Sequence, residues 1–139
     1  MSLTGNKMEI MSISLDKETL QELNEIQENL GFRSRSKMLR SAIDLLLSEY
    51  KVLESLKGIH NVVFVITYKD NEKNHVSNIL HDFEAEIKVT VHQHNGTTCL
   101  DMLNINADAQ KIKKLFAEMK RSKCIRSLNF TLLGHCQSR

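Results

Sequence analysis

Two histidines and a cysteine lie close together in the middle of the chain, within the segment HQHNGTTC at residues 92–99. Imidazole nitrogen and thiolate sulfur are typical ligands of first-row transition metals. A nucleophilic Cys-His pair is a weaker interpretation, because the sequence supplies no third orienting group and no oxyanion loop. We therefore interpret His92, His94 and Cys99 as candidate metal ligands.

The residues around these donors predict a β-hairpin. Residues 86–94 alternate apolar and polar side chains, the period of a half-buried strand, and Asn95-Gly96 is typical of a two-residue hairpin turn. A turn centred on these two residues pairs His92 with Cys99, so the three donors would share one face of the sheet. The opposite face, which we expect to pack on the core, carries Val89, Val91, Leu100 and Met102.

His81 precedes this hairpin, after a short helical segment. About six strand residues separate the start of the strand from His92, which corresponds to roughly 20 Å. Metal–nitrogen bonds are about 2 Å long, so His81 cannot reach a metal held by His92 of its own chain. If His81 is a ligand, the metal would bridge two subunits.

Length and composition are ordinary for a globular protein, with 139 residues, 41% hydrophobic and 26% charged. No apolar run approaches the roughly 18 residues of a membrane span, and the polar N-terminus lacks a signal-peptide pattern. The three cysteines are widely spaced, which favours reduced thiols in the cytoplasm over a disulfide framework. A net charge of +2 neither requires nor excludes a nucleic-acid partner.

The first fifty residues predict a strand and two helices. Residues 8–15 alternate, Asp16 is a suitable N-cap for a helix that Gly31 would end, and Ser36 is a suitable N-cap for a second helix. One strand and two such apolar helices cannot bury themselves alone. We expect this segment to fold as an intertwined dimer whose strand pairs with its mate.

The remaining residues predict the order βαββαβ of a ferredoxin-like domain, with one sheet face covered by helices, and hence an α+β protein. By strict alternation Leu103 and Ile105 fall on the free face, which we expect to be buried against another subunit. The predicted elements are a strand at 59–68, a helix at 72–83, strands at 86–94 and 97–105, a helix at 107–121 and a strand at 124–133. The predicted domains are 1–50, a helical hinge at 51–58, and 59–139.

The segment SISLDKETLQELNEIQENLGFRSRSKMLRSAID resembles the ribbon-helix-helix family of DNA-binding proteins. In that family, outward side chains of a two-stranded ribbon contact bases, and the N-terminus of the second helix contacts phosphates. The ribbon positions correspond to Ile10, Ser12 and Ser14, and the phosphate-contacting positions to Arg33, Arg35, Ser36 and Lys37.

A ribbon-helix-helix segment joined to a ferredoxin-like, ACT-type domain with the pattern H-x10-H-x-H and a following cysteine resembles the nickel-responsive regulator family, NikR. The resemblance covers nearly the whole chain. It implies Ni²⁺ bound by His92, His94 and Cys99 of one subunit and His81 of a neighbour, in a square-planar site within a homotetramer that is a dimer of dimers.

The same resemblance assigns two further positions and a function. Asp101 matches an acidic residue behind the ligands, where it would fix a ligand tautomer, and Tyr68 matches a nearby tyrosine. The implied function is a cytoplasmic, metal-responsive transcriptional regulator that binds a double-stranded DNA operator and is not an enzyme.

Several alternatives remain at the level of sequence. A ribbon-helix-helix regulator could respond to Cu, Co or Zn, since N and S donors suit all of them. It could instead sense a small organic effector through its ACT-type domain, or the protein could carry or store metal, with the first domain serving only to dimerise it.

Overall fold

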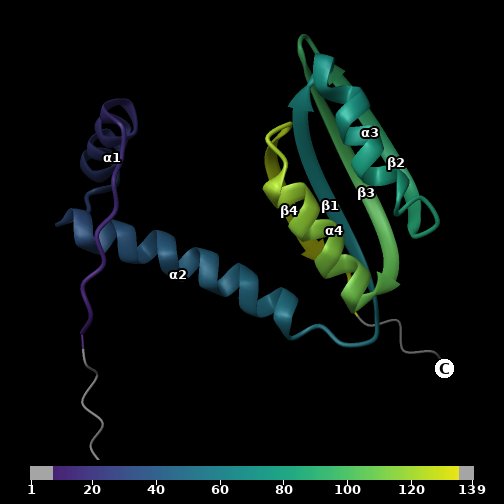
Figure 1. The fold of residues 1–139 in the computed structure, drawn as a ribbon, viewed down its shortest axis with the longest axis horizontal. Helices are drawn as coiled ribbons and strands as arrows, with labels where there is room; N and C mark the ends of the chain where they lie inside the picture. Colours follow the sequence, from purple (N-terminus) through teal and green to yellow (C-terminus); the bar gives the residue numbers. More distant parts are fainter. Residues whose placement is uncertain (1–7, 135–139) are drawn as a thin grey trace, which may run out of the picture. The chain divides into compact units, whose positions relative to one another are not determined.

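The computed structural model describes residues 8–134 and divides the chain into two compact units, Met1–Ser48 and Glu49–Arg139 (Figure 1). Helix α1 (Lys17–Leu30) lies in the first unit, and helix α2 (Arg35–Glu54) runs from the first unit into the second. No helix within residues 8–134 has the length and apolar character needed to cross a membrane.

The ends of these two helices follow from local hydrogen bonds. Asp16 caps α1, because its Oδ1 accepts a hydrogen bond from the backbone N–H of Thr19 at 2.7 Å, and Gly31 ends α1 with φ of 69°. Ser34 Oγ accepts from the N–H of Lys37 at 3.1 Å at the start of α2. The prediction that Ser36 caps this helix is therefore wrong by two residues, since Ser34 stands at the position from which a hydroxyl reaches the third N–H.

The first unit leaves most of its apolar side chains exposed. Residues 8–15 lie outside any helix or strand, and a strand there would need a partner that a single chain does not supply. Among residues 8–48, Met38 is the one buried side chain. The exposed apolar residues of α1 and α2 include Leu20, Ile26, Ile43, Leu46 and Leu47. The dimer expected from the sequence stays a prediction, and this exposed surface is what such a dimer would cover.

The second unit has the predicted βαββαβ order, so the α+β fold class is confirmed. Its antiparallel sheet has the strand order β2-β3-β1-β4. The elements are β1 (Ile59–Lys69), the 3-10 helix η1 (Asp70–Glu72), α3 (Lys73–His81), β2 (Ile87–Asn95), β3 (Thr98–Asp108), α4 (Ala109–Arg121) and β4 (Ile125–Leu132).

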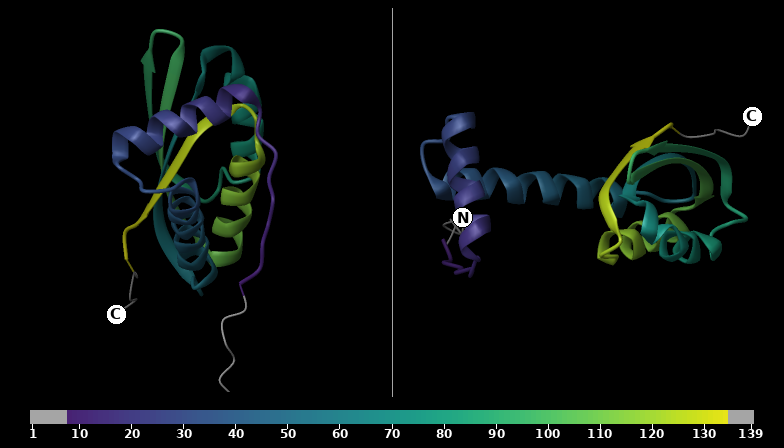
Figure 2. Two further views of the ribbon diagram at one scale, coloured as in Figure 1. Left: turned by 90° about the vertical axis from the view of Figure 1, so that its left-hand side faces the viewer. Right: turned by 90° about the horizontal axis from the view of Figure 1, so that it is seen from above.

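Helices α3 and α4 cover one face of this sheet (Figure 2). The core between helices and sheet is formed by buried side chains, among them Val62, Phe64, Ile66, Val76, Ile112, Leu115 and Met119. Leu53 and Leu56 are also buried in this core, so the end of α2 and the turn after it pack within the second unit. The division of the chain into 1–50, 51–58 and 59–139 stays a prediction.

The prediction of which sheet face packs on the core is wrong. Leu103 and Ile105 are buried under the helices, on the same face as Cys99. Val89 and Met102 lie on the opposite face and are 53% and 40% exposed. Both faces of the hairpin carry apolar side chains, so alternation identified the two faces but could not tell which one the helices cover.

Candidate metal centre

The hairpin that carries the donors turns one residue later than the sequence predicts. Asn95 pairs with Thr98, and the two loop residues are Gly96 and Thr97. Gly96 has φ of 59°, and a glycine with positive φ at the first loop position is what a type II′ turn requires. As a consequence His94, rather than His92, lies opposite Cys99.

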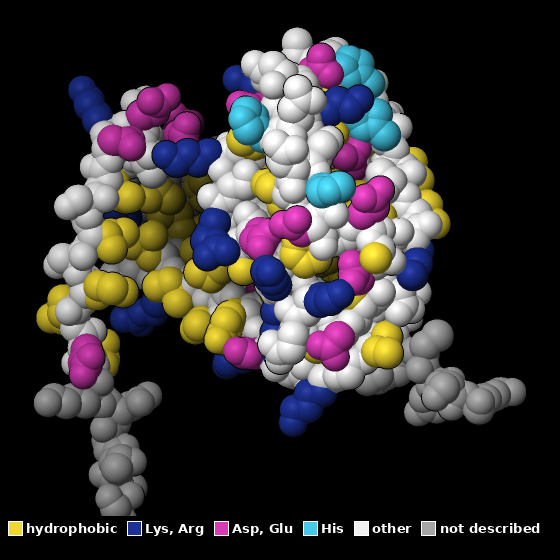
Figure 3. Space-filling view, turned by 45° about the vertical axis from the view of Figure 1, so that its right-hand side comes forward, with side chains coloured by type: hydrophobic (Ala, Val, Ile, Leu, Met, Phe, Trp, Pro, Cys, Tyr) yellow, Lys and Arg dark blue, Asp and Glu magenta, His cyan; other side chains and the backbone are white. Residues whose placement is uncertain are grey.

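This register still brings the three predicted ligands together. His92 and His94 are two residues apart on β2, so their side chains lie on the same side of the strand. His94 Nδ1 lies 3.4 Å from Cys99 Sγ. One donor atom from each of His92, His94 and Cys99 lies within 4.8 Å of the others. In the space-filling view, histidine and acidic side chains lie close together on one part of the surface of the second unit (Figure 3). The donor set of two imidazoles and one thiol therefore fits a first-row transition metal.

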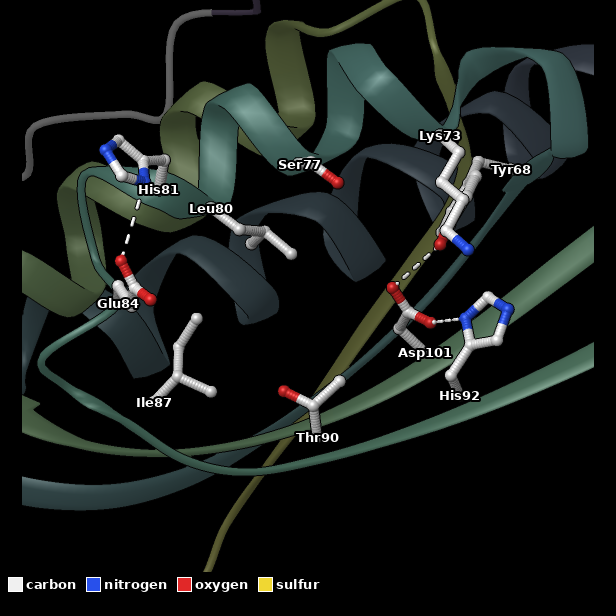
Figure 4. A pocket seen from close by; sticks show the side chains of 10 residues that line it. All are labelled: Tyr68, Lys73, Ser77, Leu80, His81, Glu84, Ile87, Thr90, His92 and Asp101. Atoms are coloured by element: carbon white, nitrogen blue, oxygen red, sulfur yellow. Dashed lines mark hydrogen bonds and ion pairs between the residues drawn. The ribbon is translucent and has the colours of Figure 1, made fainter.

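Asp101 joins His92 to Tyr68. Its Oδ1 lies 2.5 Å from His92 Nδ1, and its Oδ2 accepts a hydrogen bond from the hydroxyl of Tyr68 at 2.9 Å (Figure 4). An ionised carboxylate only accepts, so His92 carries its proton on Nδ1 and keeps the lone pair of Nε2 for a metal. Burial, and then the bond to Asp101, raises the pKa of Tyr68, which therefore stays a neutral donor.

Cys99 is fully buried beside a carboxylate that the sequence did not suggest. Its thiol lies 3.6 Å from Asp70 Oδ1, and the same oxygen is 3.7 Å from His94 Nδ1. Burial, followed by the hydrogen bond to Asp70, raises the pKa of the Cys99 thiol. Asp70 follows β1 directly, and β1 pairs with β3 next to Cys99, so only the strand pairing could have pointed to this residue.

His81 does not join the three donors in this chain. It ends α3 with its ring exposed, and its Nδ1 lies 3.5 Å from Glu84 Oε2. Figure 4 shows His81 and Glu84 at one end of an open pocket of about 490 Å³, and His92 and Asp101 at the other end. This placement agrees with the sequence argument that His81 cannot serve the site of its own chain.

The residues expected to contact DNA are all exposed. Ile10, Ser12 and Ser14 lie in the segment before α1. Arg33, Arg35, Ser36 and Lys37 lie at the start of α2 or just before it. Arg35 also donates a hydrogen bond from Nε to Asn24 Oδ1 at 3.1 Å, which ties the start of α2 to α1.

Family models match both units. Residues 58–133 match the model described as "NikR C terminal nickel binding domain". Residues 10–50 match the model described as "Ribbon-helix-helix protein, copG family".

Curated relatives match along most of their length. A protein of Methanococcus maripaludis (strain C5) named "Putative nickel-responsive regulator" is 31% identical over 130 residues, which are 91% of this chain and 92% of the relative. A Methanothermobacter thermautotrophicus protein named "Putative nickel-responsive regulator 2" is 26% identical over 125 residues, 87% of this chain and 89% of the relative.

Among solved structures, an uncharacterized protein of Thermotoga maritima matches with a TM-score of 0.50 and 20% identity, over 55% of this chain and 99% of that protein. At this identity the match shows a shared fold and nothing of function.

Proposed function

Since the chain belongs to the nickel-responsive regulator family, we propose that it is a transcriptional regulator that binds double-stranded DNA in response to Ni²⁺. The family is one of regulators and not of enzymes. The observation that carries the proposal is the convergence of His92, His94 and Cys99 on one sheet face, with Asp101 behind His92.

In this proposal the metal is held by His92 Nε2, by His94 and by the Cys99 thiolate, with His81 of the partner subunit as the fourth ligand. Bound Ni²⁺ would supply the crosslink between subunits of a homotetramer. The exposed position of His81 in its own chain supports the assignment, because a side chain that faces outward is available to a neighbour.

The DNA-binding part of the proposal rests on the first unit. Two copies would pair their residues 8–15 as a ribbon and place Ile10, Ser12 and Ser14 in the major groove. Arg33, Arg35 and Lys37 would contact phosphates together with the N–H groups that begin α2. Acting in the cytoplasm, where its thiols remain reduced, the tetramer would use metal occupancy to change the affinity of two such ribbons for one operator.

The test is DNA binding with and without Ni²⁺, measured by fluorescence anisotropy on the promoter region beside the protein's own gene. Coupling between two binding sites typically changes affinity by about 5–150-fold, and we expect Ni²⁺ to change the DNA affinity of the full-length protein within this range. His92→Ala and Cys99→Ala should abolish the response. Glu25→Gln, which changes an exposed carboxylate of α1, should retain it.

Two results would contradict the proposal in different ways. If the affinity for DNA does not change with any divalent metal, and no divalent metal binds tightly, an organic effector would be favoured. Tight nickel binding with no protected DNA in a footprinting experiment would favour a carrier or storage protein.

A further inference from the structure

A second group of metal-binding side chains lies beyond the residues that the nickel proposal uses. Glu72, His75 and Cys124 each offer one donor atom, and these atoms lie within 4.8 Å of one another. The three residues come from separate segments, namely η1, the first turn of α3 and the turn before β4. We propose that they form a second site for a divalent, sulfur-binding metal ion, with Zn²⁺ as the best-matched ion.

Strand pairing explains how these residues meet. Tyr68, near the end of β1, pairs with Cys99 on one side and with Ile125 on the other, and Cys124 directly precedes Ile125. The two cysteines therefore flank the same end of β1 from opposite edges. The three residues of η1 then supply Asp70 to the Cys99 side and Glu72 to the Cys124 side.

One carboxylate oxygen of Glu72 already contacts the other two donors. Glu72 Oε2 lies 2.8 Å from His75 Nδ1 and accepts a hydrogen bond from Cys124 Sγ at 3.2 Å. The bond from Cys124 lowers the pKa of Glu72, so this carboxylate is ionised at neutral pH. A metal ion would replace the thiol proton between these atoms.

The donor types select the class of ion. Thiolate, imidazole and carboxylate together are ligands of Zn²⁺, and three protein ligands leave a fourth tetrahedral position for water. Calcium and magnesium prefer oxygen ligands alone. One thiolate and one carboxylate also balance the charge of a divalent ion, which reduces the cost of placing it at a half-buried position.

The cluster is open to solvent on one side. The side chains of His75 and Glu72 are 69% and 33% exposed, and Cys124 is half-buried. An ion can therefore enter without unfolding of the second unit, and His75 and Glu72 can be changed without disturbing the core.

The experiment uses the full-length chain with Cys99→Ala and Cys136→Ser, which leaves Cys124 as the remaining thiol. Titration with Co²⁺ should give a sulfur-to-cobalt charge-transfer absorption at one ion per chain, and Zn²⁺ should displace the Co²⁺. Adding Glu72→Gln or His75→Ala should weaken Co²⁺ binding by about tenfold or more. Adding Glu25→Gln, in α1, should leave the affinity unchanged.

Absence of the charge-transfer band in a folded variant, or equal affinity for the Glu72→Gln, His75→Ala and Glu25→Gln proteins, would overturn the proposal. Such a result would leave a hydrogen-bonded cluster that holds the start of β4 against η1. A second measurement does not need the Cys99 substitution. When Zn²⁺ is added to nickel-loaded wild-type protein, the alkylation of Cys124, measured by mass spectrometry, should become slower. An unchanged rate would also overturn it.

Discussion

Asp101 is the residue on which the geometry of the candidate nickel site depends. It is buried, and its two oxygens accept hydrogen bonds from His92 and Tyr68, so neither oxygen is left without a partner. A carboxylate held in this way fixes both the tautomer and the orientation of the His92 ring. Residues that hold metal ligands from behind often matter nearly as much as the ligands themselves.

Replacing Asp101 with Asn should therefore weaken Ni²⁺ binding by about 10–100-fold without removing a ligand. Tyr68→Phe should have a smaller effect, because it removes one hydrogen bond and leaves the carboxylate in place. Competition with a chelator of known affinity measures both changes. Asp82→Asn, at an exposed position, is the matched control, and an Asp101→Asn protein that binds as tightly as this control would contradict the role given to Asp101.

At this scale the sequence predicted that His92, His94 and Cys99 share one sheet face, but it did not predict their pairing. The observed register places Asp101, rather than Cys99, opposite His92, a shift of two residues along β3. Side chains alternate between sheet faces, so a shift of two keeps every residue on its face, whereas a shift of one would have separated Cys99 from the histidines. Asp70 was missed because its contact with Cys99 spans twenty-nine residues of sequence.

Among the connections between secondary-structure elements, the turn between β2 and β3 is the one that bears directly on the candidate metal site. Gly96 has positive φ, but no atom lies within 4 Å of the position that a Cβ would occupy. A side chain at this position would therefore meet conformational strain and no steric clash. The hairpin holds two candidate ligands before the turn and one after it, so strain here acts directly on the candidate site.

Gly96→Ala should lower the free energy of unfolding by about 1–2 kcal/mol, the cost of placing an L-residue in the left-handed region. Gly96→Asn should lower it less, because Asn tolerates positive φ. Denaturant titration followed by circular dichroism measures both values. Equal stability of the Ala and wild-type proteins would mean that the turn relaxes to another type.

The N-cap of α1 should make stability depend on pH. The hydrogen bond from the N–H of Thr19 lowers the pKa of Asp16 below its ordinary 3.8. A lowered folded-state pKa stabilises the folded protein above the unfolded-state value, and this contribution is lost as pH falls through the folded-state pKa. Asp16→Ala should thus be less stable than wild type at neutral pH, with the difference shrinking below about pH 4.

The control is Asp16→Asn, which keeps an N-cap without a titrating group. The two variants and the wild type would be compared by thermal unfolding at several pH values. A difference between wild type and Asp16→Ala that persists unchanged at pH 2 would show that the cap does not act through the ionised carboxylate.

The residue ranges of the helices and strands of the second unit were largely predictable from the sequence. Which face of the hairpin packs against the helices was not. Hydrophobic periodicity and turn residues predicted each helix and strand of the second unit to within a few residues. Val89 and Leu103 lie on opposite faces of the hairpin, and both are apolar, so no pattern within the hairpin identifies the face under the helices. That choice depends on packing with α3 and α4, which lie elsewhere in the sequence.

At the scale of the whole molecule, two apolar surfaces lie uncovered within residues 8–134 of the single chain. One is formed by α1 and α2 of the first unit, and the other includes Val89, Val91 and Met102 on the open face of the sheet. Exposed apolar surface of this kind marks sites of association. It supports the proposed assembly, in which residues of different subunits complete one metal site.

Subunit mixing tests this assembly directly. Neither His81→Ala nor Cys99→Ala protein should bind Ni²⁺ tightly alone, because each lacks one ligand at every site. Tetramers that contain both variants should regain tight binding at the sites where intact His92, His94 and Cys99 of one subunit meet His81 of the partner subunit.

The readout is nickel stoichiometry after co-refolding and removal of loosely bound metal. A mixture of Cys99→Ala with His92→Ala is the control, since no arrangement of these two chains completes a site. No recovery in the first mixture, or equal recovery in both, would contradict a site shared between subunits.

The buried phenol beside Asp101 has one more consequence. The chain contains two tyrosines and no tryptophan, so Tyr68 and Tyr50 dominate its intrinsic ultraviolet emission. Tyr68 stays protonated and lies one carboxylate away from His92, while Tyr50 lies exposed on α2. In a Tyr50→Phe protein, Ni²⁺ bound at the hairpin should quench the emission of Tyr68, so that the fluorescence of this variant would report nickel loading without an added dye.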